Sequence, residues 1–384
     1  MAKKNLLFLT IIPIWGGATK NLLELIKRLD KNIFNSFLVL PDDRGVIYTE
    51  AIKRGIQVKL MDMPFIHLSR NPFKLFFFVF KIIQVNIRFF SLIKKLYIDM
   101  VICNTIQDSL FVCIPSKILK RKLVIYIKGI LDKRWKKIFR SRICDLFADK
   151  VVAVSKRVRD DIVKYMKNQK KAMVIYEGID VDFFRNNAAK SDIYNTGQRC
   201  FRIINIGNIA ELKGQKLLIR ALLEKEFENI DFKVFFIGEA NFERDLAYKR
   251  EMEELIGGSS LEGKVVFTGF RKNVGDYIKY SDLLVHCPVL EEGFGLVIIE
   301  AFSMEKVVVA TRVGGIPEII ENGLNGFLSD TDHKDLANKI MYVYNNQDGL
   351  GQIKSNGLST VKEKFTLDKQ IRKTQEVYCK LLEV

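Results

Sequence analysis

Two glutamates flanking a Gly-aromatic-Gly turn are the side chains of this chain best suited to chemistry. Glu292 precedes the turn Gly293-Phe294-Gly295, and Glu300 lies in the apolar stretch that follows. The glycines let the backbone turn tightly and approach a ligand, and the next helix start would offer unpaired N–H groups to a phosphate. A carboxylate at Glu300 can accept from both hydroxyls of a ribose diol. The segment predicts a sugar-nucleotide site; the alternative is an amphipathic helix with Glu300 on its wet face.

Short apolar runs alternate with helical patterns along all 384 residues, a length that suggests two domains. The runs that we interpret as strands are Leu6–Thr10, Phe37–Leu40, Met100–Cys103, Leu123–Ile127, Val151–Val154, Arg202–Ile206, Phe232–Ile237, Val265–Thr268, Leu283–Cys287 and Val307–Ala310. Helical stretches between them include Gly17–Leu29, Asp132–Phe147, Gly214–Glu224 and Asp335–Tyr344. Unbroken apolar strands separated by helices indicate parallel sheets covered on both faces. We therefore expect an α/β protein with two doubly wound, Rossmann-like domains facing a cleft.

The opening residues imitate a signal peptide, because Lys3 and Lys4 precede a short apolar stretch. Gly16 and Gly17 then lead into an amphipathic pattern, as a loop and helix after a first strand would. We interpret the opening as a strand. The six scattered cysteines form no Cys-x-x-Cys pair, which suggests reduced thiols, and the three histidines are too dispersed to suggest a metal site.

The net charge of +17 is unevenly distributed along the chain. Residues 1–171 hold 35 Lys and Arg against 13 Asp and Glu, whereas residues 172–384 hold 27 against 32. Residues 117–171 alone hold 19 basic side chains against five acidic ones, a ratio that solvated helix faces rarely show. The basic half predicts an anionic partner, such as phospholipid, lipid-linked phosphate or nucleic acid.

Residues 73–97 form a mostly apolar helical pattern with one narrow basic stripe. The stripe consists of side chains seven residues apart: Lys74, Lys81, Arg88 and Lys95. Because four charges interrupt the run, we do not expect a transmembrane span. Two interpretations stay open: a packed helix with a solvated stripe, or a helix resting on an anionic membrane with these four side chains reaching the head groups.

A series of motifs runs through the second half of the chain, in the order Ile206–Gly214, Val265–Gly269, Ser281-Asp282, Glu292 to Ala301, Thr311–Glu318 and Asn322–Leu328. This series resembles the donor domain of retaining glycosyltransferases of family four (glycosyl transferases group 1), which have the GT-B fold. Their order and spacing match over roughly residues 170–345. The first half is similar more loosely, through Gly16-Gly17, Asp99–Ile102 and Tyr176–Asp180.

The resemblance implies a nucleotide-sugar donor, such as UDP-hexose or UDP-N-acetylhexosamine, in the second domain. Lys213 would neutralise the diphosphate, Glu300 would hold the ribose, and Glu292 would contact the transferred sugar. The backbone contacts would come from Phe294, Gly295 and Leu296, and Gly16, Gly17 and Asn208 complete the expected donor-binding set. Cations and amides placed in advance stabilise the charge that a departing diphosphate gains.

Two of these features have an alternative reading. Lys213 could equally be a lysine at a helix start that points to water. Gly314-Gly315 either brings further N–H groups to the cleft or makes a turn.

Two positions depart from the family pattern. Asn208 stands where members usually carry arginine, so Lys213 lacks a cationic companion and weaker diphosphate binding would follow. Lys128 stands where many members place a histidine before a glycine. A lysine could contact the diphosphate or an anionic acceptor, but it cannot reproduce a neutral imidazole. Glu292 and Lys128 are the catalytic candidates.

The polar segment Arg185–Arg199 is expected to link the domains. We expect residues 1–178 to form an acceptor-binding, membrane-facing domain and residues 179–365 to bind the nucleotide sugar. Residues 366–384 are expected to form a C-terminal helix that crosses back to the first domain.

These features together predict a retaining hexosyl- or N-acetylhexosaminyltransferase. It would move a sugar from a nucleotide sugar, with UDP expected, to a lipid-linked or polysaccharide acceptor in bacterial surface glycan biosynthesis, such as lipopolysaccharide or capsule. We expect a cytoplasmic location, peripheral on the inner face of the cell membrane, with an anionic membrane surface as partner. No cofactor or metal is expected: Asp180-Val181-Asp182 mimics a metal motif but lies at the domain junction, and Asp330-Thr331-Asp332 reads as a helix cap.

Three alternatives belong to other classes. A nucleic-acid-binding protein would need base-stacking aromatics among exposed basic residues, whereas the aromatics here are Phe-rich and lie mostly in apolar runs, so no nucleic acid is expected. A catalytically impaired homologue could serve as an assembly partner, prompted by Asn208 and Lys128. A sugar-nucleotide epimerase of GT-B fold would convert the donor without any acceptor.

Overall fold

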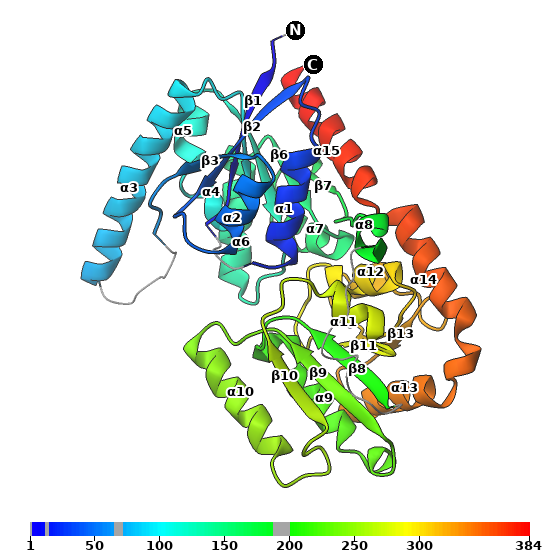
Figure 1. The fold of residues 1–384 in the computed structure, drawn as a ribbon. Coiled ribbons are helices and arrows are strands. Elements are labelled where there is room, and N and C mark those ends of the chain that lie inside the picture. The colour runs from blue at the N-terminus through cyan, green and yellow to red at the C-terminus, as the bar shows by residue number, and fades with distance from the viewer. Residues whose placement is uncertain (1, 12–14, 65–71, 187–199) are drawn as a thin grey trace. The chain divides into compact units, whose positions relative to one another are not determined.

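The computed structural model describes residues 2–11, 15–64, 72–186 and 200–384. They form two compact units: unit 1 comprises residues 1–177 and 367–384, and unit 2 comprises residues 178–366 (Figure 1). Most of the expected linker, residues 187–199, lies outside the described part of the chain.

Unit 1 is built on a parallel sheet of seven strands in the order β3-β2-β1-β4-β5-β6-β7 (Figure 1). Its strands are β1 (Lys4–Leu9), β2 (Phe34–Leu40), β3 (Gln57–Leu60), β4 (Met100–Cys103), β5 (Lys122–Ile127), β6 (Lys150–Ala153) and β7 (Ala172–Val174). Its helices are α1 (Gly17–Arg28), α2 (Val46–Lys53), α3 (Pro72–Lys95), α4 (Ile106–Ser109), α5 (Cys113–Ile118), α6 (Arg134–Phe147), α7 (Lys156–Val163) and α15 (Leu367–Leu382).

Unit 2 has a parallel sheet of six strands in the order β10-β9-β8-β11-β12-β13. Its strands are β8 (Phe201–Ile206), β9 (Phe232–Ile237), β10 (Val265–Gly269), β11 (Leu283–His286), β12 (Val307–Thr311) and β13 (Phe327–Ser329). Its helices are α8 (Val181–Asn186), α9 (Gln215–Leu222), α10 (Glu243–Ile256), α11 (Gly275–Tyr280), α12 (Leu296–Ser303), α13 (His333–Asn345) and α14 (Gly351–Lys364).

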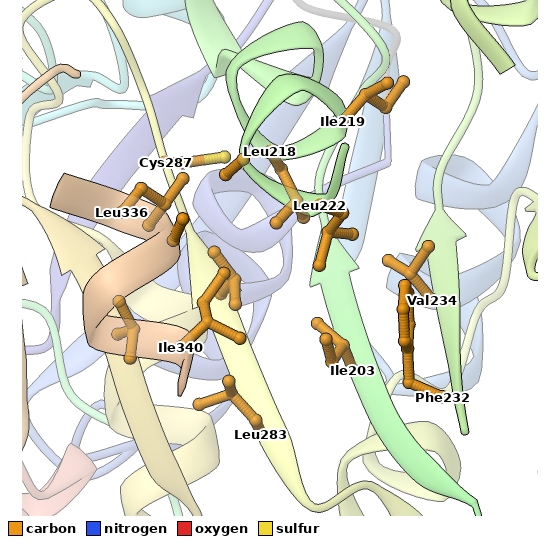
Figure 2. Close-up of a cluster of buried hydrophobic side chains, with 14 of the residues drawn as sticks. Ile203, Leu218, Ile219, Leu222, Phe232, Val234, Leu283, Cys287, Leu336 and Ile340 are labelled. Atoms are coloured by element: carbon orange, nitrogen blue, oxygen red, sulfur yellow. The ribbon is translucent and has the colours of Figure 1, made fainter. Parts of the chain in front are cut away.

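Helical spacing of apolar residues explains how the unit 2 helices attach to their sheet. Leu218 and Leu222 lie four residues apart and therefore on one face of α9. Both are fully buried against the sheet, together with side chains of α13 such as Ile340 (Figure 2). Complete burial of a leucine contributes about 1.5–3 kcal/mol. This packing fixes α9, and with it the loop that precedes α9, relative to the ends of the strands.

The first strand lies inside its sheet, with a partner strand on each side. β1 pairs in parallel with both β2 and β4, and Leu6 and Leu9 within it are fully buried. The strand interpretation of the opening residues is therefore confirmed.

Both sheets have the order expected of a doubly wound fold, so the predicted fold class is confirmed. The strand order reverses between β1 and β4 in unit 1 and between β8 and β11 in unit 2. Loops that leave the carboxyl ends of the two strands at such a point diverge to opposite faces of the sheet and leave a crevice where ligands bind. In each unit we therefore expect a site at the edge of the sheet that is formed by the carboxyl ends of its strands.

Candidate functional site

The loops after β8 and β11 bring a lysine, a histidine and a glutamate together in unit 2. Lys213 ends a short 3₁₀ turn after β8, and its Nζ lies 2.5 Å from Oε2 of Glu292. His286 is the last residue of β11, and its Nε2 lies 3.6 Å from the same oxygen. Because β8 and β11 flank the point where the strand order reverses, this cluster occupies the edge expected for a ligand.

The surroundings of this cluster fix its charges at neutral pH. Burial alone would raise the pKa of Glu292, but the Lys213 ammonium and the nearby His286 outweigh burial and hold this pKa well below its usual range. Burial lowers the pKa of His286, with Lys213 adding to the effect and Glu292 opposing it. Glu292 is therefore a carboxylate and His286 a neutral imidazole at neutral pH. An ammonium has three N–H donors, so Lys213 can contact Glu292 and a ligand oxygen at once.

A glycine from the loop after β12 fixes the backbone of Glu292. The N–H of Gly315 donates to the Glu292 carbonyl oxygen over 2.9 Å. Gly314 has φ of 58°, and a Cβ atom there would lie 1.9 Å from the same oxygen. The two glycines form a turn, and the Gly315 N–H is used inside the protein and is not offered to a ligand. The turn therefore packs against the backbone of Glu292 and holds it in place.

Helix α12 begins beside this cluster at a glycine that no other residue replaces easily. Gly295 precedes α12 with φ of 105°, a conformation that L side chains rarely adopt, and a Cβ atom there would lie 3.0 Å from Cδ1 of Ile298. Gly295 also offers no side chain to cap the helix, so the first amides of α12 start without a side-chain cap. The amide of Leu296, the first residue of α12, is one of them. Such a helix start favours an anion.

Phe294 and Glu300, which lie before and after Gly295 in the chain, are both buried inside unit 2. Phe294 is 3% exposed, and its ring meets that of Phe365 edge-on at 5.4 Å, so only its backbone can serve a ligand. Glu300, in α12, is 8% exposed. The alternative that placed Glu300 on the wet face of a surface helix is therefore wrong.

Asn208 lies in the exposed loop after β8, at the same edge of the sheet. Its carbonyl oxygen accepts a hydrogen bond of 3.0 Å from Nε2 of the buried Gln215. The loop is thus anchored through its backbone, and the Asn208 side chain is exposed.

A second group of predicted residues meets in unit 1. Lys128 follows β5, and its Nζ donates to Oε1 of Glu177 over 3.0 Å and to the carbonyl oxygen of Ala18 over 3.2 Å. Ala18 is in the first turn of α1, directly after Gly16 and Gly17. Lys128 and the two glycines therefore lie together at the carboxyl edge of the unit 1 sheet. They belong to a different unit from Lys213 and Glu292.

No contact among the described residues of unit 1 explains why residue 16 is a glycine. Gly16 has an extended backbone with φ of −169°, which any residue adopts. A Cβ atom there would meet no atom of the described residues within 4 Å.

Sequence reasoning missed three buried polar groups at these edges: His286, Glu177 and Asp108. Asp108 follows β4 and accepts hydrogen bonds from the backbone N–H groups of Ile11 and Thr105 at 2.9 and 2.6 Å. Burial raises its pKa to about 7, although these hydrogen bonds and Lys128 oppose the shift. All three groups lie at or within a few residues of the carboxyl end of an apolar strand, which is the signal that could have found them.

Helix α3 carries the predicted membrane-contact side chains. It buries Val85, Phe89 and Ile93 on one face and packs beside α5 (Figure 1). Much of the rest of its apolar surface is exposed, including Phe76 at 68% and Phe77 at 67%. The interpretation of α3 as a packed helix with only a solvated stripe is therefore wrong.

The basic stripe of α3 is only partly described. Lys81 pairs with Asp62 over 3.1 Å, and Arg88 and Lys95 are exposed. The side chain of Lys74 lies outside the described part of the structure.

The argument from charge against a membrane span in this helix does not hold. Residues Phe76–Lys95 are long and apolar enough to cross a membrane by length and composition, with a mean hydropathy of 1.7 and 22% of the stretch buried. The window of 18 residues from 76 to 93 holds only two charges, Lys81 and Arg88.

The two Asp-x-Asp segments act as helix caps where the structure describes them. Asp180 Oδ1 accepts from the Phe183 N–H over 2.9 Å at the start of α8. Asp332 Oδ1 accepts from the N–H groups of Lys334 and Asp335 at 3.0 Å each, at the start of α13. Within the described ranges, no three His, Cys, Asp or Glu side chains group as metal ligands.

Two family models match the chain, and they meet within about ten residues of the boundary between the two units. Residues 15–183 match the model of Glycosyltransferase Family 4, and residues 188–359 match that of Glycosyl transferases group 1.

Three known proteins illustrate the similarity. An uncharacterized glycosyltransferase of Methanocaldococcus jannaschii is 30% identical over 237 residues, which are 60% of this chain and 59% of that relative. The N-acetyl-alpha-D-glucosaminyl L-malate synthase of Bacillus anthracis is 26% identical over 61% of this chain and 60% of its own length. A crystal structure of HepE from Anabaena in complex with UDP and glucose superimposes with a TM-score of 0.82 at 25% identity, covering 97% of this chain and 98% of HepE.

Proposed function

The chain belongs to the group 1 glycosyltransferases of family 4, and from this membership we propose that it transfers a sugar from a UDP-sugar to a lipid-linked or polysaccharide acceptor. The transferred group is a hexosyl or N-acetylhexosaminyl residue, and the configuration at its anomeric carbon is retained. The observation that carries the proposal is the cluster of Lys213, Glu292 and the start of α12 at the edge of unit 2.

The cluster suits a nucleoside diphosphate leaving group. When the bond between the anomeric carbon and the β-phosphate oxygen breaks, the electron pair stays on that oxygen, and the diphosphate gains negative charge. Lys213 and the first amides of α12 are in place before the reaction and stabilise this charge without reorganisation. The crystal structure of HepE supports a UDP-sugar as the donor, because it contains UDP and glucose.

Glu300 and Glu292 then act as holders of hydroxyl groups. Glu300 accepts from the ribose diol, and Glu292, kept ionised by Lys213, accepts from hydroxyls of the transferred sugar. The acceptor hydroxyl attacks on the face that the diphosphate leaves, and its proton passes to the departing phosphate oxygen. Neither glutamate takes a proton in this scheme.

The acceptor side of the proposal rests on unit 1. The first 171 residues hold 35 basic side chains against 13 acidic ones, which favours an acceptor with a phosphate-linked lipid. The exposed phenylalanines of α3 would rest in the interface of the inner leaflet, with Arg88 and Lys95 near the head groups. The protein would therefore work at the cytoplasmic surface of the membrane. Gly16, whose glycine identity no contact among the described residues requires, would leave room for a substrate.

The proposal is tested by incubating the purified chain with a panel of UDP-, GDP- and ADP-sugars and a lipid extract, and measuring release of the nucleoside diphosphate. We expect release from a UDP-sugar that depends on the lipid extract, with the anomeric configuration of the product, read by NMR, unchanged. Release without any acceptor product but with an altered sugar would indicate an epimerase. Binding of no nucleotide sugar would overturn the proposal.

A further inference from the structure

A large basic cavity lies in unit 1, away from the edge that holds Lys128 and Gly16. Its volume is about 510 Å³. Seven of its lining side chains are cations: Lys117, Lys120, Arg121, Lys122, Lys150, Lys170 and Lys171. Lys122 begins β5, Lys150 begins β6, and Lys171 immediately precedes β7. The cavity is therefore at the amino edge of the sheet, the edge opposite to the one where Lys128 follows β5.

The protein itself neutralises only a small part of this charge. Asp149 is the one carboxylate among the described residues that line the cavity; its Oδ1 lies 4.0 Å from Nζ of Lys122, and its Oδ2 accepts from the Leu123 N–H over 2.8 Å. Helices α5 and α6 end beside the cavity, and a helix C-terminus equals about half a negative charge. Among the described residues that line the cavity, roughly five of the seven positive charges remain without a counterpart. Lysines that only complemented two helix ends would not need this number.

One of these lysines stands where the backbone favours glycine. Lys120 has φ of 53°. The Lys120 N–H donates to the carbonyl oxygen of Lys117 over 3.1 Å. The Arg121 N–H donates to the carbonyl oxygen of Ser116 over 2.8 Å. This pattern closes α5 as a Schellman motif with Lys120 at the left-handed position, which is usually glycine. Strain of this kind persists mainly at functional sites, and here it places a cation on the cavity.

Arg121 also lacks a partner for part of its guanidinium. Its Nε is buried and has no hydrogen-bond partner among the described residues. The side chains of Lys117, Lys120 and Lys170 likewise form no ion pair with a carboxylate in the part of the chain that the structure describes. A planar guanidinium among ammonium groups is the arrangement that binds phosphate oxygens.

We propose that this cavity binds a group that carries two or more phosphates. Its volume is in the range of ligand sites, about 300–1,000 Å³, and exceeds what a single phosphate needs. The phosphates could belong to a lipid head group or to a soluble molecule. The rim suits the lipid, because Leu146 lines the cavity and is 63% exposed, and Ile118 at the end of α5 is 62% exposed. The proposal does not depend on the donor site in unit 2.

The test compares two triple variants of the full chain with the same change in net charge. The cavity variant is Lys120→Gln, Arg121→Gln and Lys170→Gln. The control variant is Lys27→Gln, Lys31→Gln and Lys59→Gln, which changes exposed lysines of unit 1 outside the cavity. The probes are inorganic tripolyphosphate, measured by calorimetry, and phosphatidylcholine vesicles with and without cardiolipin, measured by sedimentation.

We expect the cavity variant to bind at least one probe tenfold or more weakly than the control variant. A loss for tripolyphosphate assigns the site to a soluble phosphate compound, and a loss for cardiolipin vesicles alone assigns it to a lipid head group. A single Lys120→Gly variant separates binding from folding: it should melt at a higher temperature than the wild type, because the strain is gone, and still bind more weakly. Equal binding by the two triple variants with both probes would overturn the proposal.

Discussion

Gly314 lies directly against the backbone of Glu292. A Cβ atom at position 314 would fall 1.9 Å from the Glu292 carbonyl oxygen, and the same oxygen accepts the Gly315 N–H at 2.9 Å. The orientation of Glu292 toward Lys213 therefore depends on a residue 22 positions away that has no side chain. This contact makes the turn at Gly314 part of the candidate site.

Gly314→Ala should disturb the site and the fold together. The added methyl group meets backbone rather than a movable side chain, so we expect about 1–3 kcal/mol of overpacking in addition to about 1 kcal/mol for a left-handed alanine. The matched control is Gly323→Ala, because Gly323 has φ of 78° but open space around its Cβ position. Urea unfolding and UDP titration should show a clearly larger loss for Gly314→Ala. Equal losses in the two variants would mean that the contact with Glu292 is unimportant.

Lys213→Met should leave the Glu292 carboxylate without its cation. The ion pair is mostly enclosed, with the two side chains 25% and 18% exposed. We expect a loss of stability of about 1–3 kcal/mol, and restoration of part of it in the double variant Lys213→Met, Glu292→Gln. The more exposed helical pair Lys249–Glu253, at 3.3 Å and with side chains 34% and 49% exposed, serves as the control, with an expected coupling of about 0.3–0.5 kcal/mol. A coupling energy between Lys213 and Glu292 no larger than that of the control pair would contradict the expectation that enclosure strengthens their interaction.

The same pair predicts a dependence on acid. Because the pKa of Glu292 is lower in the folded state than in the unfolded chain, its contribution to stability is complete above the unfolded value and is lost as pH falls through the folded value. The difference in unfolding free energy between wild type and Glu292→Gln should thus begin to shrink as pH falls to about 4–5, near the unfolded pKa of a glutamate, and should keep shrinking below it. Denaturant titrations from neutral to acidic pH measure it. A difference that already disappears near pH 6 would contradict the assignment.

Asp108 predicts the opposite dependence on pH in unit 1. Burial raises its folded pKa to about 7, whereas an unfolded aspartate titrates near about 3.9. The folded state therefore holds the proton more tightly, and the wild type should lose stability relative to Asp108→Asn as pH rises between these values. Above about pH 7 the difference should be constant. Unfolding curves of the two proteins across this pH range measure the difference in unfolding free energy. A difference that does not change with pH would show that the buried Asp108 is ionised throughout the range.

Helix α3 should determine attachment to membranes. Replacing Phe76, Phe77 and Ile87 by serine removes three apolar side chains that are 65–68% exposed. We expect at least a tenfold loss of binding to anionic vesicles, with the melting temperature nearly unchanged. The control replaces Leu246, Leu290 and Leu324 of unit 2, which are 47–60% exposed, by serine. Loss of vesicle binding in both variants to the same extent would show that α3 has no special role.

Apolar patterning predicted the interior of both sheets but not all of their edges. Each of the ten strands read from the sequence is present, and the three that were missed are β3, β7 and β13. All three lie at sheet edges and have only three or four residues. An edge strand such as β3 is mostly exposed and needs no continuous apolar run, so hydrophobic periodicity carries little signal there.

The candidate site was predictable where one motif contained it and not where the fold assembled it. The segment from Glu292 to Glu300 is continuous in the chain, so its turn, helix start and buried glutamate could be inferred from types and spacing. His286 and Asp108 are single residues whose role depends on neighbours distant in sequence, such as Lys213 for His286 and Ile11 for Asp108. The pairing of Lys128 with Glu177 likewise needed the three-dimensional structure.

The central claim is that Glu300 holds the ribose of a uridine diphosphate at the edge of unit 2. Calorimetric titration of UDP and of 2′,3′-dideoxy-UDP into the wild type and Glu300→Gln tests it most directly, with the exposed Glu228→Gln as control. Hydrogen bonds to a charged group contribute about 1.5–3 kcal/mol, so the variant should bind UDP about 10–100 times more weakly. It should bind the dideoxy compound as the wild type does, because the hydroxyls that Glu300 would hold are gone. Equal affinity of wild type and variant for UDP, or an equal loss with both nucleotides, would contradict the claim.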